Sequence, residues 1–325
     1  MRAGVFDPKW VYHAPGYFDI GDKHVVFKDE IGDVSYLEAF THSWNTYFMT
    51  LGLKVGRDIL IDTARSLNLG SLTNINLPGE MPGCIPDPEY VKRIHGREFG
   101  SGDLANTSIG QGDVLVTPVQ MASVMAAIAN NGTVYRPRLI KQIEDRNGNV
   151  IQAFPVEALR NVTFDDKWMP ELKAAMINVI DNGTATVVHR DDMKIAAKTG
   201  TAQVGSETHR RQIAWLSGYL PADNPQYSFS IMVEGTFADN RNDTLEGGLL
   251  GGVDAGAIAK AIFDQIYPVP GKKNKETPIA SKNKSADETA SADDVAAPAD
   301  ATTNAPAKDD TSAPADATTN APADQ

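Results

Sequence analysis

The chain has 325 residues, of which 42% are hydrophobic and 22% charged, a balance typical of a soluble globular protein with a sizeable core. Its formal net charge is −12, which argues against nucleic acid as a partner. A single cysteine, Cys84, excludes a disulfide within the chain. No apolar run is long enough to cross a membrane, and residues 1–10 lack the apolar segment of a signal peptide.

The first 70 residues predict turns followed by helices. Turn-forming pairs such as Asp7-Pro8 and Gly21-Asp22 interrupt the beginning of the chain. Short helices are predicted over residues 34–40 and 45–51. Residues 56–69 carry apolar side chains at helical spacing and end before a glycine, so they predict a third helix.

Residues 70–116 contain several prolines and glycines, which predict a long irregular excursion. Loops of this length usually carry function or cover another part of the fold. The clearest helix prediction comes directly after it, over residues 117–132. Thr117 suits the N-cap, Pro118 suits the first helical position and Gly132 suits the end. This helix is apolar on nearly all sides, so we expect it to be buried.

The remaining elements predict a sheet with helices on its two faces. They are a hairpin, a helix, three strands and a closing helix, over residues 134–154, 167–181, 193–203, 212–220, 226–235 and 254–266. Asn147-Gly148 is a strong hairpin-turn signal. The short connections between the three strands favour antiparallel pairing. The expected fold is therefore a three-layer α/β domain, with an antiparallel sheet between helices.

The composition changes near residue 269, so we expect a folded domain over residues 1–268 and a tail over residues 269–325. The tail is rich in Ala, Pro, Asp and Thr, and the eleven residues 297–307 recur at 313–323. Such a segment buries too little apolar surface to offset the entropy cost of ordering it. We therefore predict that the tail is disordered.

One short stretch, Lys198-Thr199-Gly200-Thr201, is chemically distinctive. It ends an apolar run that reads as a buried strand. A positive charge, two hydroxyl groups and a glycine without a side chain would then lie along one strand edge. This combination suits an anionic ligand that pairs with the edge, although so short a motif also occurs by chance.

Other segments give that motif a context. Ser43-Trp44-Asn45 lies upstream, and S-x-N followed by K-T-G is a signature of β-lactamases and penicillin-binding proteins. The stretches at residues 14–18, 108–112, 117–122 and 214–219 match the same pattern in the same order. Over residues 3–267 the chain resembles the transpeptidase domain of class B penicillin-binding proteins, and in particular the elongation type called penicillin-binding protein 2.

The resemblance implies acyl transfer on a peptide that ends in D-alanyl-D-alanine, and it gives five residues a role. Ser43 would relay a proton, and Asn45 would hold the peptide through its carboxamide. Lys198 would orient Ser43 and stabilise the developing oxyanion. The hydroxyl groups of Thr199 and Thr201 would bind the substrate carboxylate or that of a β-lactam. The main-chain N–H of Thr201 would form half of the oxyanion hole.

The sequence departs from the family pattern at the nucleophile. The motif S-x-x-K should precede S-x-N, yet the one serine in residues 1–42, Ser35, is followed three positions later by Glu38. The formal match at residues 281–284 lies in the tail, downstream of every other motif, and we treat it as coincidence. Ala3-Gly4-Val5 resembles the segment directly after the nucleophile helix in the family. We therefore expect an N-terminally truncated domain that lacks this helix and is inactive alone.

The resemblance also bears on ligands and partners. Some relatives carry an Asp/Asp/His/Cys zinc site before S-x-N; here Asp29 could be retained, but Ala14 stands where an acid is expected and no His or Cys follows at the right place. We predict no metal and no cofactor. The implied partners are the peptidoglycan stem peptide, β-lactams and elongation-complex membrane proteins. Full-length family members act at the periplasmic face of the inner membrane.

Two other functions are compatible with these residues. One is a non-catalytic domain that binds wall peptide or a partner protein. The other is a D,D-carboxypeptidase or a β-lactamase-like hydrolase. The long excursion over residues 70–116 and the matches over residues 108–122 favour class B transpeptidases over compact hydrolases.

Overall fold

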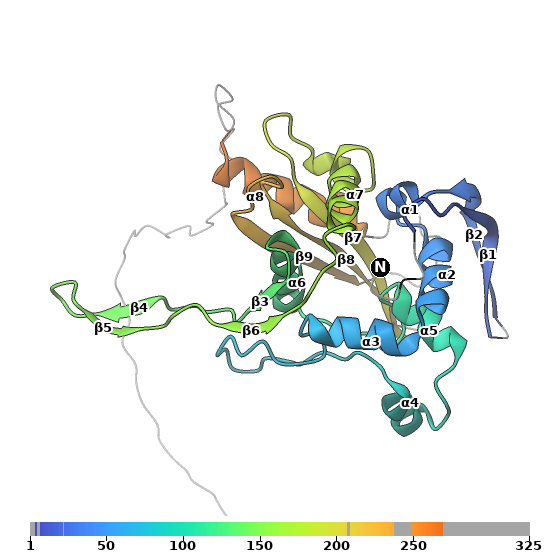
Figure 1. Cartoon of the computed structure of the whole chain (residues 1–325), viewed down its shortest axis with the longest axis horizontal. Coiled ribbons are helices and arrows are strands. Elements are labelled where there is room, and N and C mark those ends of the chain that lie inside the picture. The colour runs from blue at the N-terminus through green and yellow to red at the C-terminus, as the bar shows by residue number, and fades with distance from the viewer. Residues whose placement is uncertain (1–3, 5–6, 22, 207–208, 237–248, 269–325) are drawn as a thin grey trace, which may run out of the picture. The chain divides into compact units, whose positions relative to one another are not determined.

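The computed structural model describes residue 4 and residues 7–21, 23–206, 209–236 and 249–268 (Figure 1). All the described residues belong to the first of the two units into which the chain divides, residues 1–274. The tail predicted to be disordered lies outside the described residues, as does most of the Ala3-Gly4-Val5 stretch. Among the helices that are described, none is long and apolar enough to cross a membrane.

The centre of the first unit is a three-stranded antiparallel sheet in the order β7-β8-β9. Its strands are β7 (Ala196–Ser206), β8 (His209–Leu220) and β9 (Tyr227–Thr236), which confirms the three predicted strands. Ala196 is paired with Tyr219, and both belong to the core on one face of the sheet. Ala197, the next residue, belongs to the core on the opposite face, as the strand alternation requires.

Helices cover both faces of this sheet, so the predicted three-layer α/β architecture is confirmed. Phe263 of α8 (Gly256–Ile266) packs on one face with Leu216. Met125 of α6 (Pro118–Ala129) packs on the other face with Tyr219. The third helix, α7 (Met169–Asp181), runs beside β7 and contributes to both cores. The N-terminus of α6 is capped by Thr117, as predicted.

The N-terminal segment differs from the prediction of turns alone. It forms an antiparallel hairpin of β1 (Tyr12–Ile20) and β2 (Lys23–Val34). Two glycines shape this hairpin. Gly16 has a φ of +82° and lies where the pairing register shifts, and Gly21, with a φ of +59°, lies in the turn between the strands. A bulge and a tight turn both favour glycine, so these signals were compatible with a hairpin.

The next three helices are largely as predicted. They are α1 (Tyr36–His42), α2 (Asn45–Val55) and α3 (Arg57–Ser66). The excursion predicted as irregular nevertheless contains α4 (Pro88–His95) and α5 (Ser101–Ser108), and there the prediction was wrong. In α4, Asp87 is the N-cap, Pro88 is the first helical residue and Gly96 is the left-handed C-cap. Proline and glycine begin and end a helix here rather than prevent it.

The predicted hairpin over residues 134–154 is two ribbons instead of one. β3 (Thr133–Tyr135) pairs with β6 (Ala158–Asn161), and β4 (Gln142–Glu144) pairs with β5 (Val150–Ala153). The tip of the second ribbon contains the predicted Asn147-Gly148 pair, with Gly148 at a φ of +84°. Figure 1 shows the β4–β5 ribbon projecting from the sheet and its helices.

Candidate active site

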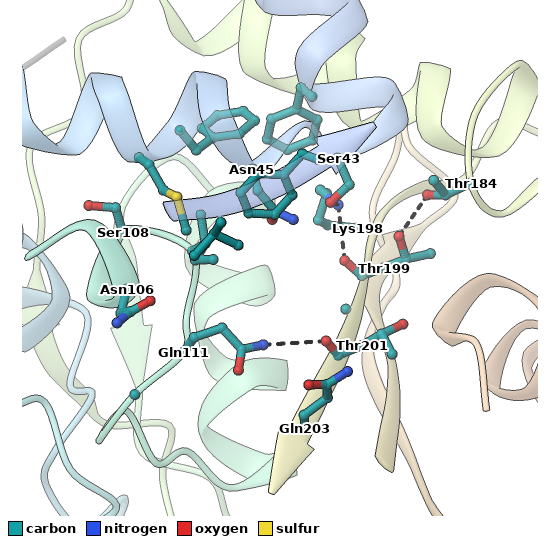
Figure 2. A pocket seen from close by; sticks show the side chains of 18 of the residues that line it. Ser43, Asn45, Asn106, Ser108, Gln111, Thr184, Lys198, Thr199, Thr201 and Gln203 are labelled. Atoms are coloured by element: carbon teal, nitrogen blue, oxygen red, sulfur yellow. Dashed lines mark hydrogen bonds between the residues drawn. The ribbon is translucent and has the colours of Figure 1, made fainter. Parts of the chain in front are cut away.

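Two residues that are 155 positions apart meet at the centre of the site. Ser43 ends α1 in the left-handed conformation, with a φ of 60°, and so redirects the chain into α2. Lys198 comes from β7, and its Nζ donates a hydrogen bond of 2.7 Å to Ser43 Oγ (Figure 2). The same Nζ donates to the main-chain oxygen of Thr199 at 2.9 Å. The structure therefore brings the S-x-N and K-T-G motifs together.

A buried carboxylate fixes the start of α2, where Asn45 lies. Glu30 of β2 is 8% exposed, and its two oxygens accept hydrogen bonds of 2.8 Å from the main-chain N–H groups of Asn45 and Thr46. An acidic group at a helix N-terminus satisfies free N–H groups and interacts favourably with the helix dipole. Glu30 was not predicted as a site residue, because its partners are main-chain groups that leave no sequence signal.

The environment of Lys198 favours the loss of its proton. The ammonium group lies 5.8 Å from the centre of the Phe40 ring, a contact that favours the charged form, but burial has the larger effect. Burial lowers the pKa of Lys198 to about 8, because the charged form is less well solvated there than in water. Near neutral pH this lysine is therefore mostly protonated but can release its proton at small cost.

This pKa is directly measurable. In a chain with reductively ¹³C-methylated lysines, we expect the Lys198 signal to titrate near pH 8, whereas exposed lysines titrate near pH 10.4. The signal that disappears in Lys198→Arg is assigned to Lys198. A Lys198 midpoint at or above 10 would show that the amine is hydrated rather than buried.

The two threonines of the motif are also engaged. The hydroxyl groups of Thr199 and Thr184 are 2.6 Å apart and share a hydrogen bond. Thr201 Oγ1 accepts from the main-chain N–H of Gly251 at 3.3 Å, and its main-chain oxygen accepts from Gln111 Nε2 at 3.4 Å. Thr184, Gly251 and Gln111 were not predicted as site residues, although Gln111 lies in one of the matched motifs.

Gly251 must be a glycine at this position. A Cβ atom there would lie 2.4 Å from the main-chain oxygens of both Gly200 and Trp215, far inside contact distance. The absence of a side chain lets the segment before α8 lie directly on β7 and β8, and this places its N–H on Thr201. The segment that contains Gly251 therefore supports the site from behind.

The residues of the S-x-N and K-T-G motifs line a cavity of about 850 Å³, which is large enough for a small molecule or a short peptide. One wall is polar and holds Ser43, Asn45, Lys198, Thr199 and Thr201, so the cavity gathers all five predicted site residues. Figure 2 shows Asn106, Ser108 and Gln111 opposite them. The remaining lining, which we call the apolar wall, comes from the hairpin and from α1 and α2, the helices that flank Ser43, through Ile20, Val25, Phe27, Phe40, Phe48 and Met49.

The described residues offer no obvious place for a metal ion. No group of three or more His, Cys, Asp or Glu side chains among them has the geometry of a metal site. Ala14 is fully buried in the hairpin, and Glu30, a nearby buried acid, is occupied by the start of α2.

Comparison with known proteins identifies the family. The model of the penicillin-binding protein transpeptidase domain matches residues 1–266. The chain belongs to this family. It is 30% identical over 295 residues to the peptidoglycan D,D-transpeptidase MrdA of Acinetobacter baumannii, covering 86% of this chain and 42% of that protein. It is also 30% identical over 239 residues to the peptidoglycan D,D-transpeptidase PbpA of Mycobacterium tuberculosis, covering 71% of this chain and 43% of that protein.

Solved structures of penicillin-binding proteins share the fold. Pseudomonas aeruginosa PBP2, solved in complex with WCK 5153, is 28% identical and superposes with a TM-score of 0.69, over 83% of this chain and 58% of that one. PBP2 of Helicobacter pylori, solved with MreC, is 24% identical with a TM-score of 0.64 and supports the fold alone. The chain spans less than half the length of the curated relatives named here. The resemblance inferred from the motifs is confirmed at the level of the family.

Proposed function

We propose that this chain forms the substrate-binding and proton-relay part of a peptidoglycan D,D-transpeptidase site. The observation that carries the proposal is the 2.7 Å hydrogen bond from Lys198 to Ser43, in a cavity that Thr199 and Thr201 also line. Two curated relatives at 30% identity bear the name of this activity. The substrate would be a stem peptide ending in D-alanyl-D-alanine.

The proton relay would run through Ser43. A hydroxyl group donates and accepts at once, so Ser43 can take a proton from the reacting group while it shares one with Lys198. A lysine with a pKa near 8 supports both directions of transfer near neutral pH. While protonated, Lys198 also lowers the free energy of the oxyanion that forms at the reacting carbonyl.

Substrate binding would use the free edge of β7. This strand is at one end of the sheet order, so an extended peptide can add to it through main-chain hydrogen bonds. The hydroxyl groups of Thr199 and Thr201 would exchange their present partners for the substrate carboxylate, and the N–H of Thr201 would form half of the oxyanion hole. Asn45, in the polar wall, would hold the peptide through its carboxamide.

The nucleophile is the missing component. No serine in residues 1–42 stands three positions before a lysine. We therefore propose that the 325 residues alone are not acylated, and that a segment carrying S-x-x-K completes the site against the apolar wall. The place of action would be the periplasmic face of the inner membrane, where elongation-complex membrane proteins would be partners.

Labelling with a fluorescent penicillin tests this function. We expect no covalent label on the chain alone, and a label that unlabelled penicillin blocks once the chain is joined to a preceding segment that carries S-x-x-K. Lys198→Ala in the joined protein should reduce labelling by about 10²–10⁴-fold, because a positioned proton-transfer group contributes that much. Labelling of the chain alone would refute the missing nucleophile. A folded joined protein that takes no label would refute the transpeptidase site.

A non-catalytic domain that binds wall peptide is the second candidate. The polar residues that line the cavity favour it, since binding a peptide needs only hydrogen-bonding and charged groups of this kind. Binding of a D-alanyl-D-alanine peptide by the chain alone, measured by calorimetry and abolished in Thr199→Val, would support this function. A hydrolase has no comparable observation in its favour.

A further inference from the structure

Residues 136–157 form the projecting ribbon, which we call the arm. Its base is fixed: Arg136 donates to the main-chain oxygen of Asn74 at 2.9 Å, to Asn76 Oδ1 at 3.1 Å and to Glu157 Oε2 at 3.1 Å. β4 and β5 pair only with one another within the described part of the chain. Each therefore has an outer edge with no strand beside it.

The arm exposes large apolar side chains. Ile140 is 53% exposed, Ile143 44%, Val150 52% and Ile151 68%. A two-stranded ribbon alone is marginally stable in water, and an open edge with apolar neighbours is a template for pairing with another strand. Because the base holds the arm out, its edges are accessible to another molecule.

The hydrogen bonds within the arm decide which main-chain groups face outward on β4. The N–H of Phe154 donates to the oxygen of Lys141, and the N–H of Asp145 donates to the oxygen of Asn149, both at 2.9 Å. In an antiparallel pair such groups alternate between inward and outward. The main-chain groups of Lys141 and Asp145 point toward β5. The main-chain N–H and C=O groups of Gln142 and Glu144 therefore point to the outer edge.

A second copy of β4 matches this edge. Consider a two-fold axis that passes between the two copies at Ile143. Gln142 of each copy then exchanges main-chain hydrogen bonds with Glu144 of the other. Ile143 then faces Ile143 of the second copy. Lys141 of each copy faces Asp145 of the other, so two opposite-charge pairs flank an apolar pair and no like charges are opposed.

We propose that two copies of this chain associate through their arms, with β4 paired to β4 in this register as the centre of a four-stranded sheet. The β5 edge is the weaker alternative, because Val150–Ala153 contains no charged residue and offers no charge pair to set a register. This proposal does not depend on the function proposed for the cavity.

A disulfide test reads the register. In a Cys84→Ser background, Ile143→Cys places two thiols at a non-hydrogen-bonded pair, where Cα atoms are about 4.5 Å apart, within the range of a disulfide. Mild oxidation should give a covalent species of twice the 35.0 kDa of one chain. Ile151→Cys is the matched control on the other edge; it is more exposed and should stay monomeric. Cross-linking of Ile151→Cys as fast as Ile143→Cys would overturn the register.

Sedimentation equilibrium tests association without cysteines. The unmodified chain should show an average mass that rises toward the dimer with concentration. Lys141→Asp should weaken the dimer about tenfold, because it replaces two attractive pairs by two like-charge pairs. Lys23→Asp, with the same charge change at the exposed first residue of β2, should leave the dissociation constant unchanged. A chain that remains monomeric at every concentration would overturn the proposal.

Discussion

Arg190→Ala is expected to lower the free energy of unfolding by about 3 kcal/mol, because it removes a buried charged group together with its partners' hydrogen bonds. The Arg190 side chain is 3% exposed. It donates two hydrogen bonds to Asp192, at 2.8 and 2.7 Å, and one to Asp264 at 3.0 Å. It also donates to the main-chain oxygens of Phe263 and Tyr267, at the end of α8. This one guanidinium therefore fastens the last helix to the segment before β7.

Chemical denaturation of the unmodified chain and of Arg190→Ala measures this loss of stability, and Arg190→Lys is the matched control. Lysine keeps the charge but not the fork of donors, so it should restore only part of the lost stability. The hydrogen bond from Arg190 lowers the pKa of Asp192. A lowered carboxyl pKa contributes stability above the unfolded value of about 3.9 and loses it as the pH falls toward the folded value. The difference in unfolding free energy between the unmodified chain and Arg190→Ala should therefore shrink below about pH 4. An undiminished difference at pH 3 would contradict this coupling between Arg190 and Asp192.

Glu30→Ala should destabilise the start of α2 by about 2–4 kcal/mol, because two buried N–H groups lose a charged acceptor. The affected amides are those of Asn45 and Thr46, each now 2.8 Å from the carboxylate. Hydrogen exchange at these two amides should accelerate strongly, while exchange within β8 follows only the global change in stability.

Glu30→Gln keeps the shape of the side chain but removes its negative charge, so it separates the two contributions to stability. Its amide oxygen can accept from one of the two N–H groups, so its cost should be about half that of Glu30→Ala. In the protein joined to an S-x-x-K segment, Glu30→Ala should also slow labelling by penicillin, because Ser43 lies just before the loosened helix end. An unchanged rate of hydrogen exchange at Asn45 and Thr46 in Glu30→Ala would show that the carboxylate does not hold the start of α2.

The secondary structure was predictable where local signals are unambiguous. Thr117, Pro118 and Gly132 mark both ends of α6, and the three apolar stretches after residue 193 became β7, β8 and β9. The prediction failed where glycine and proline have two meanings. The turn predicted at Gly21 joins two strands that were not predicted, and Pro88 opens a helix. The backbone conformation that a glycine adopts is decided by the groups that pack around it, which sequence spacing does not reveal.

The sequence by itself determined the family, because the order and chemistry of S-x-N, Ser108–Gly112 and K-T-G are specific when read together. Residues 1–42 contain no S-x-x-K motif. Only the tertiary structure placed Lys198 Nζ on Ser43 Oγ across 155 residues and aligned Gly251 and Glu30 behind the motifs. The reason is physical: Glu30 and Gly251 act through main-chain N–H groups, and the contact of Lys198 with Ser43 depends on long-range packing, so neither leaves a periodic or compositional trace in the chain.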